Sequence, residues 1–247
     1  MKLFSIALGF LTIFPVKTND YEPGDIGRAA VYYPFVGLII GGIVGILHAL
    51  LLAVFTPMIS AALALLVWAG LSGFLHLDGL SDCADALFYA GNKEKRLSIL
   101  KDSRVGSFAV VLVVLYFLLK IAVFEPLPVN PEWSIFLIAY ASMMARWVMV
   151  FIGQISEPAR SEGMGLEFKQ GLQASKWWFS LLLPLVMTIL GSYLLGLHVL
   201  VAGALVVLLG WLISRFSKRQ LGGFTGDILG MAVELSEVLC LLVFAVR

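Results

Sequence analysis

The chain has 247 residues, of which 60% are hydrophobic and only 13% charged, and its mean hydropathy is +0.97. A water-soluble domain is nearer half apolar and a quarter charged, so most of this chain must be surrounded by lipid. The net charge of +1 gives no reason to expect a nucleic-acid partner. The two cysteines fit neither a disulfide framework nor a metal-binding spacing.

The apolar segments predict an all-α, polytopic integral membrane helical bundle that forms a single domain over residues 1–247. Residues 3–14 are apolar but short, which indicates an interfacial helix rather than a cleavable signal. Seven later segments approach the roughly 20 apolar residues that a membrane-crossing helix needs, and their continuous apolar runs argue against barrel strands. These segments are 31–55, 58–75, 107–124, 133–153, 177–197, 199–214 and 228–246.

The loops between these segments alternate in charge. Most of the 17 basic residues fall in the N-terminal arm and in the second, fourth and sixth loops, whereas the other loops contain none. The positive-inside rule therefore predicts a cytoplasmic N-terminus and a C-terminus outside. Lys120, near the outer end of its segment, is expected to snorkel. The acidic residues gather on the basic side, which indicates an active site that opens toward the cytoplasm.

The first polar motif is HLDGLSDCADALF, residues 76–88. On a helix, Asp78, Asp82 and Asp85 share one face, where their mutual repulsion would be relieved by a divalent cation such as Mg²⁺ or Mn²⁺. His76 could be a metal ligand, but a hydrogen bond to substrate or to a carboxylate suits it better. A solvated acidic helix end would show the same spacing, although acids beside a membrane are usually functional.

The second motif is LKDSRVGS, residues 100–107. Asp102 can join the acidic set, and Lys101 and Arg104 could hold phosphate, because the arginine fork suits phosphate oxygens. A basic membrane boundary without any ligand remains an equal alternative.

The third motif is RFSKRQLGGFTGDILG, residues 215–230. Gly222 and Gly223 predict a flexible turn, and Thr225 with the neighbouring backbone N–H groups could form an anion site at a helix N-terminus. Asp227 begins this helix. Glu234, seven residues on and within the apolar run, needs a metal, a base or a polar substrate as partner. An ordinary turn is the alternative, since a lone glycine-rich turn is a weak signal.

Three further charged residues are candidates for contact with substrate. Arg146 lies in the cytoplasmic half of its apolar segment, where it must pair inward or snorkel. Arg160 and Glu162 lie in the following loop and have room to reach a ligand, although Arg160 could equally just set the topology. Acid and base clusters with glycine turns on one membrane face favour chemistry on a diphosphate.

The motifs HLDGLSDCADAL, ILKDSRVGSF and LGGFTGDILGMAVELSE, in that order, closely resemble the cobalamin synthase family. The resemblance extends to LGFLTIFPV, to YPFVG at 33–37 and to EGMG at 162–165, and so covers nearly the whole chain. The members of this family are adenosylcobinamide-GDP ribazoletransferases of the bacterial inner membrane.

The resemblance implies a Mg²⁺-dependent reaction in which α-ribazole, or its 5′-phosphate, attacks adenosylcobinamide-GDP. GMP leaves, and adenosylcobalamin or its 5′-phosphate forms. On this basis Asp78, Asp82 and Asp85, with Asp102 or Asp227, are expected to bind Mg²⁺, and Asp82 could instead be the general base. Arg104, Arg146 and Arg160 become candidate phosphate clamps, and His76 and Glu234 candidate contacts with substrate.

Two other functions remain open from the sequence. The first motif is similar to the aspartate-rich signature of CDP-alcohol phosphotransferases, but that full signature is not reproduced. A transporter would also use acids within a membrane. It usually places them near the midplane and shows internal repeats, neither of which is visible here.

Overall fold

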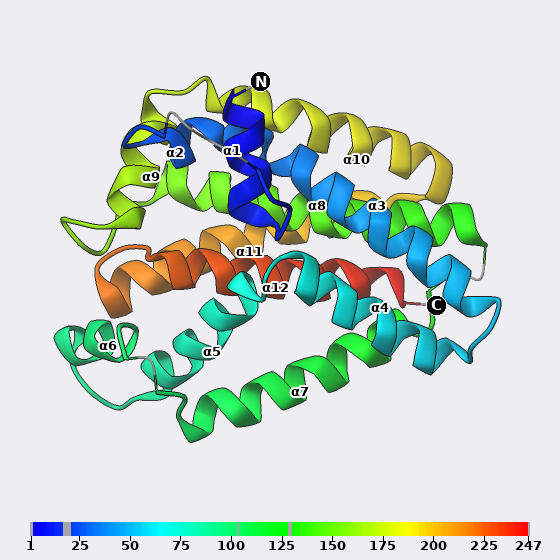
Figure 1. The fold of residues 1–247 in the computed structure, drawn as a ribbon, viewed down its shortest axis with the longest axis horizontal. Coiled ribbons are helices and arrows are strands. Elements are labelled where there is room, and N and C mark those ends of the chain that lie inside the picture. Colours follow the sequence, from blue (N-terminus) through cyan, green and yellow to red (C-terminus); the bar gives the residue numbers. More distant parts are fainter. Residues whose placement is uncertain (1, 17–20, 103, 128–129, 247) are drawn as a thin grey trace.

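The computed structural model describes residues 2–16, 21–102, 104–127 and 130–246, and in these residues it is a helical bundle without β-strands. Most helices run roughly parallel to the long axis of the molecule, whereas α1 crosses them steeply (Figure 1). The expected all-α fold is thereby confirmed. The helices are α1 (Lys2–Leu11), α2 (Asp25–Ala29), η1 (Ala30–Tyr32), α3 (Tyr33–Leu52), α4 (Pro57–Leu71), α5 (Leu75–Phe88), α6 (Lys93–Ile99), α7 (Ser107–Phe124), α8 (Pro131–Ile155), α9 (Met164–Gln173), η2 (Trp177–Leu181), α10 (Leu182–Leu195), α11 (Leu197–Leu221) and α12 (Gly226–Phe244).

Local sequence signals explain where several of these helices begin and end. The side chains of Asn92 and Thr225 cap α6 and α12 by accepting backbone N–H groups three residues later. Proline stands in the first turn of α3, α4 and α8, where its missing N–H costs nothing. Gly222 ends α11 in the left-handed region, at φ 85°, which a residue with a side chain rarely adopts.

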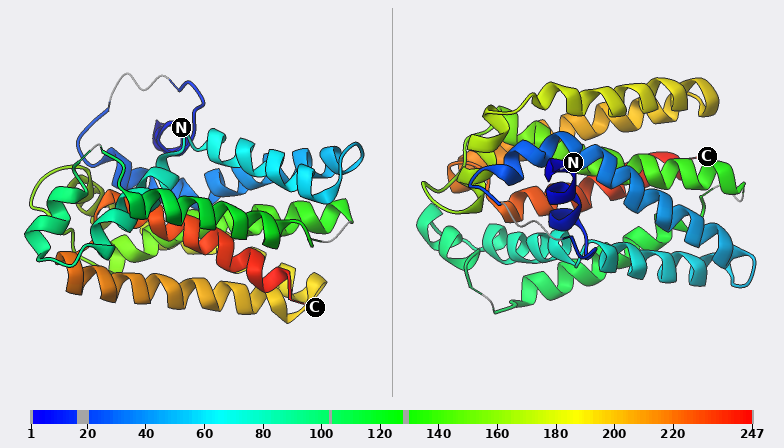
Figure 2. Two further views of the ribbon diagram at one scale, coloured as in Figure 1. Left: turned by 90° about the horizontal axis from the view of Figure 1, so that it is seen from below. Right: turned by 45° about the horizontal axis from the view of Figure 1, so that its top comes forward.

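Helices α8 and α12 form the buried centre of the bundle (Figures 1 and 2). Helix α3 packs closely on α8 through Gly37, Gly41 and Gly45, which are spaced at one helical turn. A Cβ atom at Gly41 or Gly45 would lie only 2.6 or 2.8 Å from a Cα atom of α8. Small residues thus allow the two backbones to touch, which is a common way to join helices in a membrane.

The number of membrane spans differs from the expected seven. All seven apolar segments are helical, but by length and composition five spans qualify: residues 25–52 (α2 to α3), α7, α8, residues 177–195 (η2 to α10) and α11. Helix α4, with 15 residues, is too short alone, and together with α5 it would make a sixth span that bends by 91°. Helix α12 is long enough but carries Asp227, Glu234 and Glu237, so it depends on partners inside the bundle.

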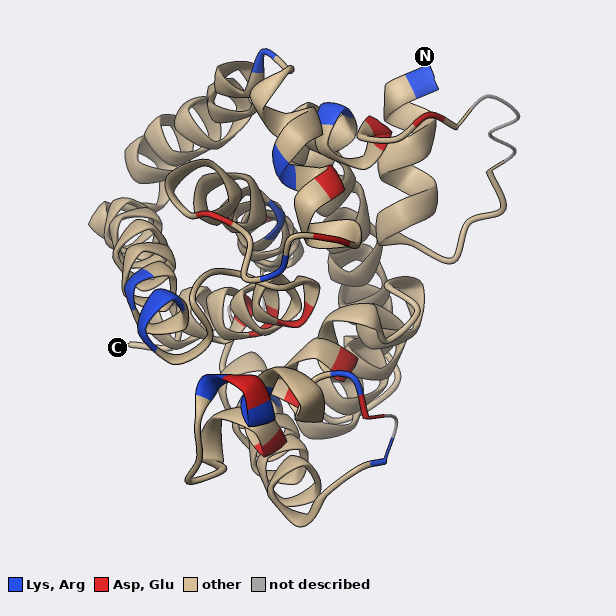
Figure 3. Ribbon diagram, turned by 90° about the vertical axis from the view of Figure 1, so that its left-hand side faces the viewer, with Lys and Arg blue, Asp and Glu red and all other residues tan. Residues whose placement is uncertain are grey.

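The loops gather as the charge pattern predicts. Helices α6 and α9 and the turn between α11 and α12 lie at one end of the bundle, and the C-terminus lies toward the other end (Figure 1). Viewed from the first end, many of the acidic and basic residues lie on the helix ends and loops that face the viewer (Figure 3). We call this end of the bundle the polar end.

Candidate active site

A cleft opens at the polar end between α5, the start of α12 and the segment 158–168. It consists of two adjoining cavities of about 190 and 230 Å³. Met164, Gly165, Gly226 and Asp227 line both cavities. His76 and Asp78 of α5 line the first cavity, and Arg160, Glu162 and Thr225 line the second. Residues from three distant motifs thus reach one cleft.

Close packing of α5 on α12 places Asp227 beside the aspartate stripe. A Cβ atom on Gly79 would lie 2.8 Å from the carbonyl oxygen of Asp227, and one on Gly230 would lie 3.2 Å from the backbone of His76. Asp82 is within electrostatic range of Asp78 and Asp227. The two glycines therefore hold carboxylates of two helices together; Asp227 is a neighbour that the sequence predicts for the stripe, whereas the role of the glycines is not predicted by it.

The carboxylates of Asp78 and Asp82 have no ion pair or hydrogen bond within the described part of the chain. Asp227 accepts a hydrogen bond of 3.1 Å from the Thr225 hydroxyl. Among the described residues, no three acidic, histidine or cysteine side chains are already close enough to enclose a metal ion. The arrangement is therefore an open group of oxygen ligands rather than a closed cage.

Two other predicted ligands have partners in the protein. Asp85 accepts hydrogen bonds from the backbone N–H groups of Gly106, at 2.7 Å, and Ala109, at 3.1 Å, so its carboxylate caps the start of α7. Asp102 forms a two-pronged ion pair with Arg104, with a shortest distance of 2.6 Å. The Arg104 hydrogen bonds lower the pKa of Asp102 to about 2. None of these three charged side chains lines either cavity.

His76 is buried, with an exposed fraction of 1%, and it lines the first cavity. Neither ring nitrogen has a hydrogen-bond partner in the described structure. A buried polar group normally finds a partner, because leaving it unpaired costs about 1–3 kcal/mol. His76 is therefore available to a ligand in this cavity.

The glycine-rich turn acts mainly through its backbone. Gly223 packs against Glu157, Pro158 and Ala159, so closely that any side chain would clash, and backbone hydrogen bonds of 2.8 and 2.9 Å join this segment to Phe224. Gly222 ends α11. Neither glycine lines the cleft, so the expectation that both contact substrate is not supported; Gly226, which has open space beside it, faces both cavities instead.

Arg160 and Glu162, which follow the segment that contacts Phe224, line the second cavity. One nitrogen of the Arg160 guanidinium donates to the Leu97 carbonyl oxygen at 2.9 Å, which fixes the side chain and leaves its other donors free. Lys169 lies nine residues further on and is buried. Its ammonium donates to the carbonyl oxygens of Gly153, Gln154 and Ser156, so it caps the end of α8. Lys169 thus has a structural partner, whereas Arg160 keeps donors for a ligand.

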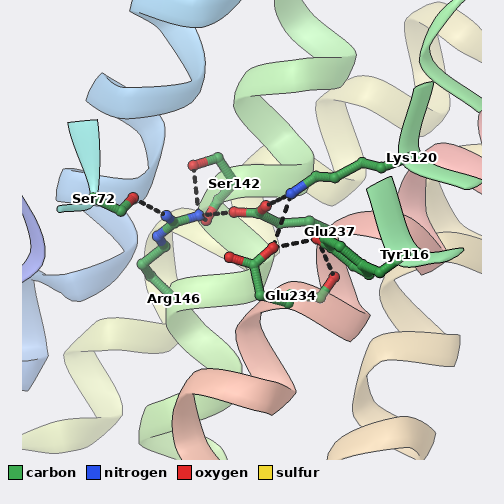
Figure 4. A network of polar contacts seen from close by, with 7 residues as sticks. All are labelled: Ser72, Tyr116, Lys120, Ser142, Arg146, Glu234 and Glu237. Atoms are coloured by element: carbon green, nitrogen blue, oxygen red, sulfur yellow. Dashed lines mark hydrogen bonds and ion pairs between the residues drawn. The ribbon is translucent and has the colours of Figure 1, made fainter. Parts of the chain in front are cut away.

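Four charged side chains form a separate network inside the bundle (Figure 4). Lys120 of α7 pairs with Glu234 at 3.0 Å and with Glu237 at 2.5 Å. Glu237 also pairs with Arg146 of α8, and Tyr116 donates to Glu234. Ser72 and Ser142 accept hydrogen bonds from Arg146 at 2.9 and 3.0 Å.

This interior network decides between the alternatives for three residues. Lys120 does not snorkel as expected, because its ammonium is buried between two carboxylates. Arg146 pairs inward, with Glu237, as one of its two alternatives predicted, and its buried side chain is therefore not placed to clamp a phosphate. Glu234 has a base, Lys120, as its partner, which confirms one of its expected partners, and it lines neither cavity of the cleft.

The fold and the cleft together define a polytopic helical membrane protein with a group of unpaired carboxylates at one end. The chain belongs to a family of known enzymes: the family described as cobalamin-5-phosphate synthase matches residues 3–245. No solved structure matches the chain.

Curated relatives cover almost the full chain. A protein of Pseudomonas aeruginosa is 39% identical over 247 residues, with 97% of this chain and 96% of the relative covered. A protein of Deinococcus radiodurans is 38% identical over 244 residues, covering 97% of this chain and 84% of its own length. One of Desulfitobacterium hafniense is 34% identical, with 98% and 96% covered. All three are named adenosylcobinamide-GDP ribazoletransferase.

Proposed function

We propose that this protein is an adenosylcobinamide-GDP ribazoletransferase that assembles the nucleotide loop of cobalamin. The observation that carries the proposal is the family match over nearly the whole chain, joined to a cleft in which the shared motifs meet. A hydroxyl oxygen of α-ribazole, or of its 5′-phosphate, forms a bond to the phosphorus next to the corrinoid. The bond between that phosphorus and the GMP oxygen breaks, and the hydroxyl loses its proton.

We propose Mg²⁺ as the cation of this site. Asp78 and Asp227 of the cleft, with the neighbouring Asp82, would hold it after their side chains move together, because they repel one another without a cation and neither Asp78 nor Asp82 has an ion pair among the described residues. When bound, the ion would neutralise charge on the diphosphate and on the leaving GMP. Asp85 and Asp102 are less suited, since both carboxylates already have partners.

The remaining groups of the cleft suit a phosphorylated substrate. Arg160 and the first N–H groups of α12, around Gly226, can donate to phosphate oxygens in the second cavity. His76 can donate to or accept from the attacking ribazole in the first cavity. Asp82, which neighbours this cavity without lining it, is the proposed acceptor of the hydroxyl proton if it does not bind the ion.

The size of the cleft limits what it encloses. Its two adjoining cavities of about 190 and 230 Å³ together lie near the lower end of the roughly 300–1,000 Å³ of sites that enclose a drug-sized ligand. We propose that the diphosphate and its neighbours enter the cleft, and that the larger corrin ring stays outside. The concentration of basic loops at the polar end supports a location in the bacterial inner membrane with the cleft facing the cytoplasm.

The test is to reconstitute the purified chain in liposomes with adenosylcobinamide-GDP, α-ribazole and Mg²⁺. GMP and a cobamide should appear in equal amounts, and chelation of Mg²⁺ should stop their formation until the ion is restored. The absence of both products would refute the function, whereas full turnover with chelator would refute only the metal.

A further inference from the structure

The last three turns of α11 carry a group of exposed cations and aromatic residues. Arg215, Lys218 and Arg219 are all exposed, and so are Trp211 and Phe216. The Arg215 guanidinium lies 5.5 Å from the centre of the Trp211 ring, a cation–π distance. Tryptophan favours the level of lipid headgroups, so this contact holds the arginine at the membrane boundary.

Two grooves run along opposite sides of this helix end. One, of about 590 Å³, lies between α11 and the pair α5 and α12, and is lined mainly by apolar side chains such as Leu87, Leu212 and Leu235. The other, of about 720 Å³, lies between α11 and α8, where Phe151 and Ile155 line it. Trp211, Arg215 and Arg219 belong to both grooves. An apolar groove and a groove of mixed lining, with apolar side chains on its α8 side, thus meet at one cationic ridge.

The cations of this ridge differ from three other basic residues at the polar end, whereas Lys93 and Lys95 of α6 likewise have no ion pair among the described residues. Arg28 pairs with Asp25 and Glu22, Arg104 with Asp102, and Lys169 with Glu157. Within the described residues, Arg215, Lys218 and Arg219 form no ion pair. The helix dipole and the positive-inside rule explain why cations stand here, but not why two grooves with apolar side chains converge on them.

We propose that this end of α11 binds one anionic phospholipid. The head group lies on Arg215, Lys218 and Arg219, and the two acyl chains lie in the two grooves. The charge of the ridge selects an anionic over a zwitterionic lipid, and the pair of grooves matches a diacyl lipid. The site is separate from the cleft, so the proposal does not depend on the proposed function.

The test is native mass spectrometry of the full chain, titrated with phosphatidylglycerol and with phosphatidylcholine of the same acyl chains. The wild-type protein should prefer phosphatidylglycerol. The double variant Arg215→Gln/Arg219→Gln should bind phosphatidylglycerol about 25-fold more weakly, from the attraction of each basic residue for an anionic membrane surface, with phosphatidylcholine nearly unchanged.

The matched control is Lys93→Gln/Lys95→Gln in α6, which removes two exposed cations from the same end of the bundle. It should keep the lipid preference. Leu212→Trp, which fills one groove, should weaken both lipids by the same factor. Equal binding of both lipids by the wild type, or an equal loss in the lysine control, would overturn the proposal. An unchanged affinity in Leu212→Trp would overturn the place given to the acyl chains.

Discussion

The interior network and the cleft both contain carboxylates from α12, but only the carboxylates of the interior network are paired with basic side chains. In the interior, Glu234 and Glu237 face Lys120 and Arg146, so two acids meet two bases away from water. At the cleft, Asp78 and Asp227 line the first cavity and Asp82 lies within electrostatic range of both without lining it, and within the described residues no base forms an ion pair with them. Burying a charge is costly unless it is paired, so the first group is stable by itself.

This difference indicates which region of the molecule can bind a ligand. The charges of the interior network already neutralise one another, so they do not attract a cation or a phosphate. The unpaired carboxylates at the polar end repel one another, and a bound cation would relieve that repulsion. The close contact of α5 and α12 at Gly79 holds that second group together before a ligand binds. The comparison therefore predicts stability effects for the interior and catalytic effects for the cleft.

The largest effect is expected for Glu237→Gln. This change leaves Lys120 and Arg146 with one neutral partner in place of a carboxylate, and breaking a buried ion pair costs about 3–5 kcal/mol. The free energy of unfolding, from detergent denaturation followed by circular dichroism, measures it. Glu125→Gln, at the exposed end of α7, should lose little stability. Equal stability of the two variants would show that the interior pairing is dispensable.

The next effect concerns turnover. Asp82→Asn and Asp227→Asn should each lower kcat about 10²–10³-fold, because they remove charge that stabilises the transition state. Their thermal stability should be unchanged or slightly higher, since repulsion between carboxylates falls. GMP release measures kcat, and Glu94→Gln on exposed α6 is the control. Turnover at the wild-type rate in both variants would remove the cleft from the mechanism.

A smaller effect is expected where α5 packs on α12. Gly79→Ala would bring a Cβ atom to 2.8 Å from the Asp227 carbonyl oxygen, and such overpacking costs about 1–3 kcal/mol. Stability and turnover should fall together, because α5 must move away from α12. Gly42→Ala is the matched control, as Gly42 lies in α3 with nothing within 4 Å of a new Cβ atom. If Gly79→Ala behaves like this control, close packing does not position the aspartates.

The smallest effect is expected at Asp102. Its pKa of about 2 in the folded protein lies below the ordinary value of about 3.9, so its contribution to stability is complete above pH 4 and is lost only as the pH falls toward 2. Asp102→Asn should therefore leave the pH dependence of stability above pH 5 unchanged and alter kcat less than about fivefold. A larger loss of activity would indicate that Asp102 belongs to the metal site after all.

Much of the fold follows from the sequence alone. Continuous apolar runs predicted helices at all seven segments, and the alternation of basic loops predicted that the polar motifs would lie at one end. Three motifs far apart in the chain, represented by His76, Arg160 and Asp227, do reach one cleft. Their roles there remain predictions.

What the sequence could not give is the partner of each charge. Lys120 and Glu234 are 114 residues apart, and the apolar pattern around Lys120 does not show which helix faces it. Asp85 shares the helical spacing of Asp78, but the N–H groups that it caps belong to another helix. The bend between α4 and α5 was also missed, because the apolar run continues past Gly73, and Phe74 adopts the left-handed region there.

The interior network also has a consequence for biosynthesis. Helix α7 leaves the ribosome before α12, so Lys120 enters the membrane more than a hundred residues ahead of its acidic partners. Arg146 likewise precedes Glu237 by 91 residues. Until α12 is made, the nascent protein carries two cations without their carboxylate partners. Helix α12 is thus the last helix that the interior needs for its charges to be balanced.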